Sequence, residues 1–470
     1  MWRTGAQIRR PDPPVDTSWT ALGLARALRE GERSAVEVVR ELLDRLDRLR
    51  PVIGAVAAVD PKRSLADADA ADRRLRAGEA RALEGVPFTV KDWIDVAGWP
   101  ISGSVSASHP GDRERRPAVD ASAVARLRAA GGVMLAVTRV WADSPAHGPT
   151  RNPHEPSRNP GGSSSGAAAL VAARASPVAL GSDSGGSIRL PAAWCGVAGL
   201  KPTYGRVPLT GHFPRLGALE DGRTVIGPLA KTVDDLAVVL AQIAGPDGLD
   251  AGVAPVPLGD PGEVDLSALR VAVVPPHEIC DFAGTPGVPP HEICDFAGTP
   301  GVGDGPTAVA ASALLAAGAD IVDDKVPDVR DEALELTRRY WARAELTGSE
   351  YVRVLWDWDR FRRRVLVATA GIDVVICPAA AEPAPPWREW SETDYQWTLP
   401  WSLTGAPAVV VPVGTQGGLP VAVQVVGRPW QDHVALAAAR CVEAFAPRVP
   451  YADPFGPAAT LADTPTQEGR

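Results

Sequence analysis

The chain has 470 residues, of which 45% are hydrophobic and 22% charged, as is typical of a globular protein with a large core. Its net charge of -9 argues against nucleic acid or an anionic membrane surface as a partner. There is no apolar run of about 18 residues, and the first residues lack the apolar core of a signal peptide, so we expect a cytoplasmic protein.

The N-terminal half predicts helices that alternate with buried strands. Residues 1–16 are polar and proline-rich and predict a loose arm. Ser34 and Glu37 form a capping box that opens an amphipathic helix, and we expect Pro51 to end it. The other elements expected in this half are helices over 64–77 and 121–130 and strands over 86–90 and 133–137.

The C-terminal half continues this alternation and adds a hairpin. Residues 409–413 and 421–426 are valine-rich, and the Gly417-Gly418 pair between them predicts an antiparallel connection. The other elements expected here are helices over 232–243, over 306–317 and within 330–370, and strands over 270–274, 319–323 and 372–377. The pattern predicts an α/β fold, in which helices cover both faces of a mixed sheet.

Five cysteines lie scattered along the chain without a C-x-x-C pair, so the sequence predicts neither a disulfide framework nor a zinc site, and we expect no cofactor. Two of them belong to a perfect tandem copy, in which residues 274–287 recur unchanged as residues 288–301. A single copy is not a solenoid, which needs several stacked repeats to bury a core. We interpret it as a recent duplication or a sequence-assembly error that forms a surface loop away from the chemistry.

Residues 161–187 combine features that a linker does not have. Glycine and serine crowd both ends, at 161–166 and 181–187, whereas the residues between them predict a buried helix over 167–173 and a buried strand over 178–180. A flexible linker is not interrupted by apolar segments. Glycines let backbone N–H groups approach a reacting atom, and serines supply nucleophiles or proton carriers. The stretch is therefore our candidate catalytic centre.

This stretch closely resembles the signature of the amidase signature family of serine hydrolases. Residues 85–92 (GVPFTVKD) are similar to the lysine strand of that family, and residues 405–409 and 418–429 resemble its closing segment. The resemblance covers about residues 17–447 and implies a single α/β/α domain with a large mixed sheet flanked by helices. It leaves residues 448–470 as a C-terminal tail.

The resemblance implies three catalytic roles. Ser187 is the expected nucleophile, Ser163 is the expected proton relay held by a cis peptide, and Lys91 is the expected base. A lysine is a base only when it is neutral, which requires burial to lower its pKa, and the apolar run before Lys91 supplies that setting. Of the lysines in the chain, only Lys91 closes such a strand.

The glycines before Ser187 predict an oxyanion site. The backbone N–H groups of Ser184, Gly185, Gly186 and Ser187 are expected to form a nest for the negative charge that develops on a carbonyl oxygen under attack. We expect the charged residues that flank this loop, one acidic and one basic, to pair with buried partners and to fix the loop in place.

Two other interpretations of these serines remain open. Residues 162–166 fit the G-x-S-x-G nucleophile elbow with Ser164 at its centre, a mechanism that also needs an aspartate and then a histidine downstream, such as His212 or His433. Residues 161–166 could instead cradle a phosphate in a non-catalytic binding protein, although no G-K-[S/T] follows them.

Residues 137–148 differ from the glutamine-dependent amidotransferase subunit, which is the best-known branch of the family. That branch typically ends the strand with Lys-Thr-Asn and continues into a long loop rich in serine and threonine. This chain has a shorter segment that carries a tryptophan, Trp141. A free-standing amidase is therefore favoured over the amidotransferase subunit, which stays as the alternative within the family.

The chain contains 14 tryptophans, many of them within residues 341–401, and core packing is the simplest role for most. In the family this variable region helps to wall the substrate channel, so the candidate pocket residues are Trp141, Trp390, Trp397 and Trp401. A tryptophan-lined entrance favours flat apolar substrates, as in aryl acylamidases or urethanases. We expect a small-molecule amide or carbamate substrate, no nucleic-acid or membrane partner, and a monomer or homodimer.

Overall fold

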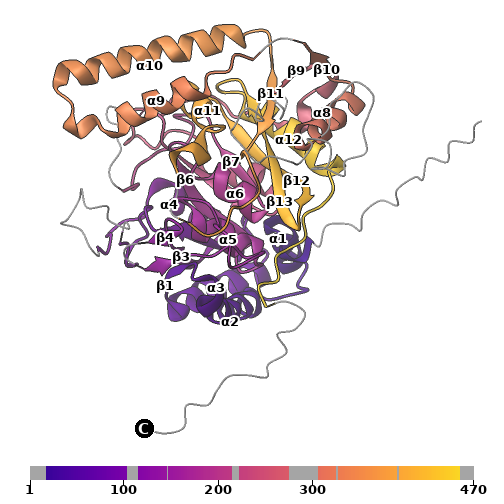
Figure 1. Ribbon diagram of the computed structural model, residues 1–470. Coiled ribbons are helices and arrows are strands. Elements are labelled where there is room, and N and C mark those ends of the chain that lie inside the picture. Colours follow the sequence, from indigo (N-terminus) through magenta and orange to yellow (C-terminus); the bar gives the residue numbers. More distant parts are fainter. Residues whose placement is uncertain are drawn as a thin grey trace, which may run out of the picture.

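The computed structural model describes residues 17–102, 115–144, 147–213, 222–274, 305–323, 326–388 and 391–455. Within these ranges one sheet of 11 strands runs through the middle of the molecule. The indigo N-terminal helices lie at one end of the molecule, and two orange helices from the C-terminal half lie at the other (Figure 1).

The sheet combines parallel and antiparallel pairs. Its strands, in spatial order, are β1 (Val56–Val59), β3 (Val133–Thr138), β2 (Pro87–Lys91), β6 (Val178–Asp183), β8 (Val225–Ala230), β7 (Ala198–Lys201), β12 (Ala408–Gln416), β13 (Leu419–Gly427), β11 (Val374–Pro378), β9 (Arg270–Val273) and β10 (Asp320–Val322). β2 runs parallel to β3 and β6, and β9 runs parallel to β10 and β11, whereas the other neighbours are antiparallel. The predicted mixed α/β sheet is confirmed.

Helices pack on both faces of this sheet, as predicted. They are α1 (Ala21–Arg29), α2 (Ala35–Ile53), α3 (Pro61–Arg76), α4 (Ser122–Ala129), α5 (Ser165–Ala172), α6 (Arg189–Cys195), α7 (Val233–Ile243), α8 (Pro306–Ala316), α9 (Arg330–Trp341), α10 (Gly348–Ala368), α11 (Leu399–Thr404) and α12 (Asp432–Phe445). Side chains of a strand alternate between its two faces. In β11, Val374 and Ile376 join the core cluster that includes α7, α8 and α12, whereas Val375 and Cys377 join the cluster of α9 to α11.

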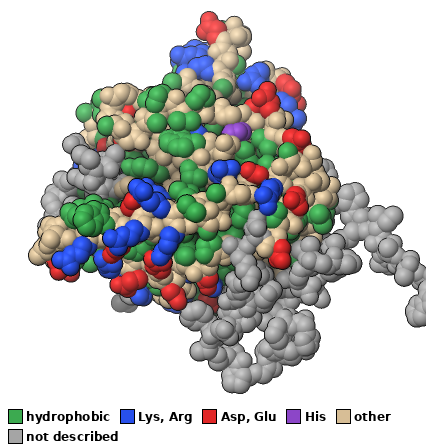
Figure 2. Space-filling view, turned by 90° about the horizontal axis from the view of Figure 1, so that it is seen from above, with side chains coloured by type: hydrophobic (Ala, Val, Ile, Leu, Met, Phe, Trp, Pro, Cys, Tyr) green, Lys and Arg blue, Asp and Glu red, His purple; other side chains and the backbone are tan. Residues whose placement is uncertain are grey.

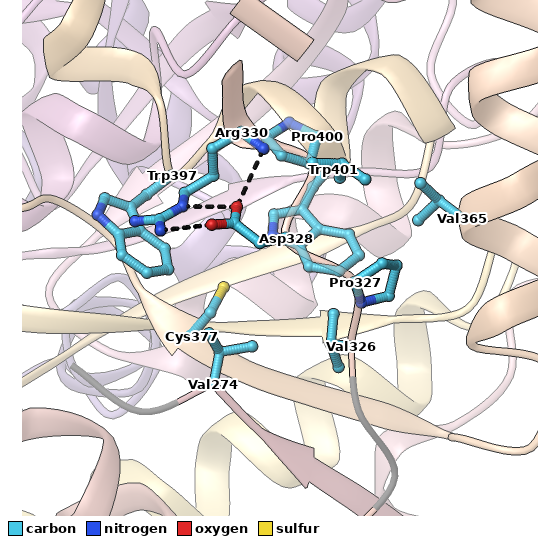
Figure 3. Close-up of a pocket in the computed structure, with 11 residues that line it drawn as sticks. Val274, Val326, Pro327, Asp328, Arg330, Val365, Cys377, Trp397, Pro400 and Trp401 are labelled. Atoms are coloured by element: carbon cyan, nitrogen blue, oxygen red, sulfur yellow. Dashed lines mark hydrogen bonds and ion pairs between the residues drawn. The ribbon is translucent and has the colours of Figure 1, made fainter. Parts of the chain in front are cut away.

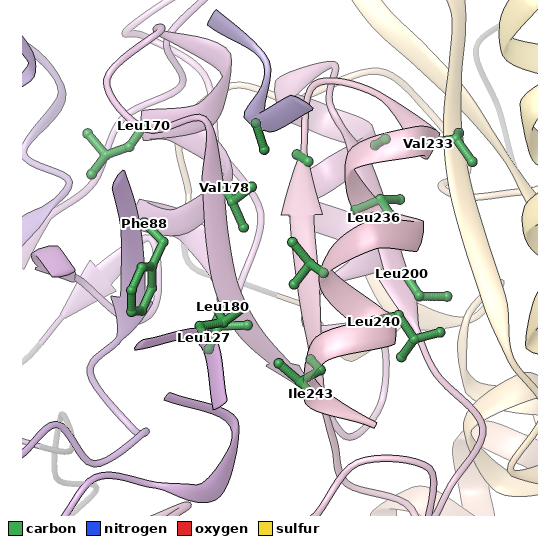
Figure 4. Packing of buried hydrophobic residues seen from close by; sticks show 14 of the residues in the cluster. Phe88, Leu127, Leu170, Val178, Leu180, Leu200, Val233, Leu236, Leu240 and Ile243 are labelled. Atoms are coloured by element: carbon green, nitrogen blue, oxygen red, sulfur yellow. The ribbon is translucent and has the colours of Figure 1, made fainter. Parts of the chain in front are cut away.

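The larger core cluster includes residues of the strands that lead to the candidate catalytic centre. Figure 4 shows Leu236 and Leu240 of α7 among the buried side chains that pack together with Val178 and Leu180 of β6. Burying such side chains contributes about 1.5–3 kcal/mol each. The packing therefore fixes β6, whose last residue opens the loop of the expected nucleophile.

One helix end differs from the expectation. α2 begins at the predicted capping box, but it continues past Pro51 to Ile53. Gly54 ends it in the left-handed conformation, with φ of 66°, and donates its backbone N–H to the carbonyl oxygen of Arg50. Proline in the last turn removes only one helical hydrogen bond, and the burial of Ile53 offsets that loss.

The hairpin forms with longer strands than predicted. β12 reaches Gln416 and β13 begins at Leu419, so the turn consists of Gly417 and Gly418 alone. Both glycines have positive φ, 57° and 80°, as a tight two-residue hairpin turn requires.

The packed part of the chain extends beyond residue 447, where the sequence placed the start of a tail. Lys231 donates its ammonium to the carbonyl oxygen of Val449 at 2.7 Å, and Ala452 donates its N–H to the carbonyl oxygen of Ala172 at 2.9 Å. The rest of the predicted tail, the N-terminal arm over 1–16 and nearly all of the tandem copy lie outside the described residues.

Charged side chains of both signs are interspersed with apolar ones on the face that Figure 2 shows. Such a mixture differs from the continuous basic face that nucleic-acid binding requires. In the ranges that the structure describes, every helix is too short or too polar to cross a membrane.

Candidate active site

β2 ends by placing the Lys91 amine inside the protein, as the sequence predicts. Nζ lies 2.7 Å from Ser163 Oγ, 3.2 Å from the carbonyl oxygen of Ser182 and 4.6 Å from the centre of the Trp93 ring. Burial lowers the pKa of Lys91 to about 7, and the negative charge of Asp183 opposes this shift only in part. Burial thus favours the neutral amine, which is the form that can accept a proton.

The loop of Ser163 has the backbone that the resemblance implies. The peptide bond between Gly162 and Ser163 is cis, and Ser163 is fully buried. Ser164 donates its backbone N–H to the carbonyl oxygen of Ser187 at 3.0 Å, which joins the two serine loops. Among the described side chains, no hydrogen bond connects the hydroxyls of Ser163 and Ser187, which lie on the two joined loops.

Asp183, the last residue of β6, organises the loop before Ser187. Its carboxylate accepts the backbone N–H of Gly186 at 2.8 Å. This N–H, which the sequence assigned to the oxyanion site, is therefore already used. In the described part of the chain the N–H groups of Ser184, Gly185 and Ser187 donate no hydrogen bond, so these three remain candidates for the expected oxyanion site.

Arg189 forms a buried ion pair with Asp183 and connects it to distant parts of the chain. Its Nε and Nη2 each lie 3.0 Å from an oxygen of Asp183. It also donates to the Thr398 carbonyl at 2.8 Å, to Gln424 Oε1 at 2.9 Å and to Ser402 Oγ at 2.6 Å. Burial by itself raises the pKa of Asp183, but the Arg189 charge and hydrogen bonds hold that pKa below its ordinary value. Asp183 and Arg189 are the flanking charged residues that were expected to have buried partners. They pair with each other, and Arg189 also binds Thr398, Gln424 and Ser402.

A short segment without any sequence motif holds both serine loops. Tyr395 donates its hydroxyl to the carbonyl oxygen of Gly162 at 2.9 Å, and Thr398 donates its hydroxyl to that of Gly185. A Cβ atom on Gly186 would lie 2.2 Å from Thr398 Oγ1, so only glycine fits there. The sequence analysis missed Tyr395 and Thr398 because their partners lie 233 and 213 residues away.

Ser164, the centre of the alternative nucleophile elbow, faces backbone groups. Its Oγ donates to the carbonyl oxygen of Ser182 at 3.3 Å and accepts the Ser182 N–H at 3.4 Å. None of the histidines that the structure describes is hydrogen-bonded to it. His433 packs against Gly259, where a Cβ would lie 2.5 Å from its ring. The Ser-His arrangement that the elbow requires is therefore absent from the described residues.

The predicted pocket tryptophans fall in different places. Trp141 lies beside the loop of Ser163, with its ring 3.2 Å from the position of a Cβ on Gly162. Trp397 and Trp401 are only 5% and 7% exposed, and they line a cavity whose walls include none of the expected catalytic residues, Lys91, Ser163 and Ser187 (Figure 3). Trp390 lies outside the described residues.

Two further tryptophans lie at the site. Trp93 follows Lys91 by two residues and meets Trp141 edge to face, with ring centres 5.8 Å apart. Trp341, the last residue of α9, has its ring 3.5 Å from the position of a Cβ on Gly185. The closeness of Trp93 to Lys91 in the sequence was a usable signal, whereas the position of Trp341 depends on how α9 packs.

No group of three or more metal-binding side chains occurs in the described ranges. Cys195 and Cys377 are fully buried, as the sequence predicts. Burial raises the pKa of both thiols, that of Cys377 to about 12, so they are packing residues rather than nucleophiles.

Comparison with known proteins identifies the family. The family model described as Amidase matches residues 37–285 and 303–436. The chain is 35% identical over 474 residues to a Mycobacterium tuberculosis protein named amidase AmiB2, and the match covers 92% of this chain and 98% of that protein. The chain therefore belongs to the amidase family, and it is a hydrolase that acts on linear amide carbon–nitrogen bonds.

Two other relatives describe the range of this family. The native peptide amidase from Stenotrophomonas maltophilia has the same fold, with a TM-score of 0.72 and 27% identity over 94% of this chain and 99% of that one. A glutamyl-tRNA(Gln) amidotransferase subunit from Chloroflexus aggregans is 32% identical over 479 residues, covering 87% of this chain and 93% of that protein. The fold and the family thus agree with the resemblance seen in the sequence.

Proposed function

We propose that this chain hydrolyses small-molecule amides with Ser187 as the nucleophile, Ser163 as the proton relay and Lys91 as the base. The observation that carries the proposal is the 2.7 Å contact between Lys91 Nζ and Ser163 Oγ, buried inside the protein. A serine hydroxyl is a weak nucleophile until a base removes its proton, and a buried lysine with a pKa of about 7 is such a base.

A second buried lysine supports this interpretation by contrast. Burial also lowers the pKa of Lys201 to about 7, but its Nζ donates to the carbonyl oxygens of Pro202 and Ala406. These contacts serve to join two backbone segments. Lys91 instead meets a hydroxyl that can itself give and accept a proton, as a relay requires.

The proposed reaction takes one proton from Ser187 and later delivers it to the leaving nitrogen. Ser163 takes the proton of Ser187 and gives its own to neutral Lys91, while the Ser187 oxygen bonds the substrate carbonyl carbon. The N–H groups of Ser184, Gly185 and Ser187 stabilise the resulting oxyanion. As the carbon–nitrogen bond breaks, the proton returns through Ser163 to the leaving nitrogen, and water then hydrolyses the acyl-enzyme by the same relay. The contact between Ser163 and Ser187 forms on substrate binding, since catalytic hydrogen bonds often tighten in the complex.

Aryl amides and aryl carbamates are the proposed substrate class. Trp93, Trp141 and Trp341 lie at the two serine loops and keep part of their surface exposed. Exposed indole rings beside a reacting centre favour flat apolar groups. The expected state of monomer or homodimer stays a prediction.

The test replaces the nucleophile. Ser187→Ala should abolish both turnover of an aryl amide and labelling by a fluorophosphonate probe, with an unchanged circular dichroism spectrum. Ser164→Ala is the matched control, because Ser164 is buried and its hydroxyl contacts only backbone groups among the described residues, and it should retain most of the activity. If the two variants exchange behaviour, the elbow mechanism is correct instead.

The second candidate is a glutamine-dependent amidotransferase subunit, since a relative at 32% identity has that name. It predicts that glutamine is the preferred substrate and that a partner complex raises its turnover. A panel of glutamine, aliphatic amides, anilides, esters and carbamates on the purified chain distinguishes the two. A free-standing amidase turns over anilides or carbamates faster than glutamine.

A further inference from the structure

The described tryptophans differ in exposure. Five of them lie in the core and are 1–7% exposed: Trp99, Trp194, Trp358, Trp397 and Trp401. Trp93 and Trp141 are half-buried, and Trp341 is 38% exposed. These three rings lie beside Lys91 or against the two serine loops, and each keeps part of its surface exposed.

Trp93 and Trp141 lie on one side of the reacting centre. Trp141 donates its backbone N–H to the carbonyl oxygen of Ser163 at 3.0 Å, and its ring lies against Gly162. The ring of Trp93 covers Lys91 Nζ and meets Trp141 edge to face. Both indoles therefore adjoin the proton relay.

The backbone of Trp141 indicates that its position is specifically maintained. Its φ is 68°, a left-handed conformation that is uncommon for a bulky residue. Such conformations persist where the surrounding structure holds them, and they cluster at functional sites. Here the hydrogen bond to Ser163 holds the backbone that directs the ring toward the relay loop.

Trp341 lies at the other loop. Its ring packs against Gly185, whose N–H belongs to the proposed oxyanion site, and the guanidinium of Arg223 lies 5.2 Å from the ring centre. Trp93 and Trp141 thus lie beside the proposed proton relay, whereas Trp341 lies beside the proposed oxyanion site.

We infer that Trp93 and Trp141 wall the subsite of the leaving amine and select an aromatic amine there. The inference rests on the proposed function. The relay returns its proton from Ser163 to the leaving nitrogen, so that nitrogen must lie within hydrogen-bond reach of Ser163 Oγ. Its substituent then lies beside the rings of Trp93 and Trp141, whereas the carbonyl oxygen points toward the N–H groups of the other loop. The preferred substrates are therefore anilides and N-aryl carbamates, rather than amides that are aromatic only in the acyl half.

The experiment compares two matched substrate pairs. Acetanilide and N-cyclohexylacetamide differ only in the ring of the amine, and benzamide and cyclohexanecarboxamide differ only in the ring of the acyl group. The ratio of kcat/KM within each pair is measured for the unmodified protein and for each variant, with active sites counted by fluorophosphonate labelling. Comparing ratios between variants cancels the intrinsic reactivity of each substrate and any loss common to all of them.

Trp141→Leu should lower the ratio of the amine pair about threefold to tenfold, which is the range expected for losing one aromatic contact, mainly through KM. The ratio of the acyl pair should not change. Trp93→Leu should act in the same direction, and it tests the inference independently if Trp141→Leu does not fold.

Two controls complete the design. Trp341→Leu should leave the amine ratio unchanged, although total activity can fall. Trp356→Leu, at a 62% exposed position on α10, should change neither ratio nor activity. The inference is overturned if Trp141→Leu and Trp93→Leu shift both pairs equally or shift only the acyl pair. Persistent turnover in Ser187→Ala, or no turnover of any of the four amides, would instead overturn the proposed function and this inference with it.

Discussion

The two parts of the chain that meet at the active site are built differently. The first, residues 85–92 and 161–189, is a dense motif in which small residues place hydroxyls and N–H groups at the reacting centre. The second, residues 395–404, has no motif, and its polar groups form hydrogen bonds with the first part. Tyr395 and Thr398 each hold a carbonyl oxygen of a serine loop. The motif thus contains the groups that we propose to react, whereas the second part keeps the backbone of the serine loops in position.

Arg189 is the link between the two parts. Its guanidinium binds Asp183 on the motif side and Thr398 and Ser402 on the other side. Because Asp183 also accepts the N–H of Gly186, the position of the oxyanion loop depends on contacts outside the motif. Variants in each part should therefore fail in different ways.

The largest effect is expected within the motif. Lys91→Ala should lower kcat by about 10⁴-fold, because it removes the base that activates the nucleophile. The protein should stay folded, because relief of the amine's desolvation offsets part of the cost of the cavity and of the unpaired partners Ser163 and Ser182. The measurement is kcat for an anilide together with thermal unfolding. His433→Ala, which removes a group outside the relay, should keep the rate within about tenfold; loss of activity there with native stability would contradict the Ser-Ser-Lys assignment.

The next-largest effect is expected for Arg189, which links the two parts of the active site. Arg189→Met should destabilise the fold by about 3–5 kcal/mol, because it leaves the buried Asp183 carboxylate without its partner. The matched control is Arg364→Met, whose exposed ion pair with Glu332 should contribute no more than about 1 kcal/mol. Urea unfolding measures both.

A double variant sharpens this result. Adding Asp183→Asn to Arg189→Met removes the uncompensated charge, so part of the lost stability should return. Equal stability of the single and double variants would mean that the network around Arg189 does not depend on the ion pair.

The pH dependence should follow Lys91. Burial lowers its pKa to about 7, and only the neutral amine accepts a proton, so activity should fall as the pH drops below that value. The value of kcat/KM should rise about tenfold between pH 6 and pH 8 and then level off. If kcat/KM reached half of its maximum only above pH 9, burial would not lower the pKa of Lys91 as proposed.

The smallest effect is expected in the part without a motif. Tyr395→Phe removes the hydroxyl that binds the Gly162 carbonyl but keeps the ring, so kcat should fall about threefold to tenfold with little change in KM. The pH at half-maximal activity should not move, because Lys91 keeps its surroundings. A larger fall in kcat than for Lys91→Ala would mean that residues 395–404 contribute more to the reaction than the motif does.

Much of the fold and of the site could be predicted from the sequence, because those features depend on local patterns. Apolar periodicity located many of the helices and strands, although it missed α1, α12, β1, β7 and β8, and the capping box at Ser34 located the start of α2. The resemblance of residues 85–92 and 161–187 to the family signature located the expected catalytic groups, and the apolar strand before Lys91 predicted the burial of the lysine. These signals lie within a few residues of the feature that they describe.

Tertiary structure decided the features that depend on distant partners. Gly186 was expected to offer its N–H to the substrate, but the carboxylate of Asp183 takes it. Trp341, Trp397 and Trp401 all belong to the tryptophan-rich region 341–401. Packing buries Trp397 and Trp401, whereas it brings the ring of Trp341 against Gly185 in the loop before Ser187. The sequence determines which groups a chain possesses and which local structures they form. The direction of a side chain, and the partner that engages it, are decided by the packing of segments far apart in the chain.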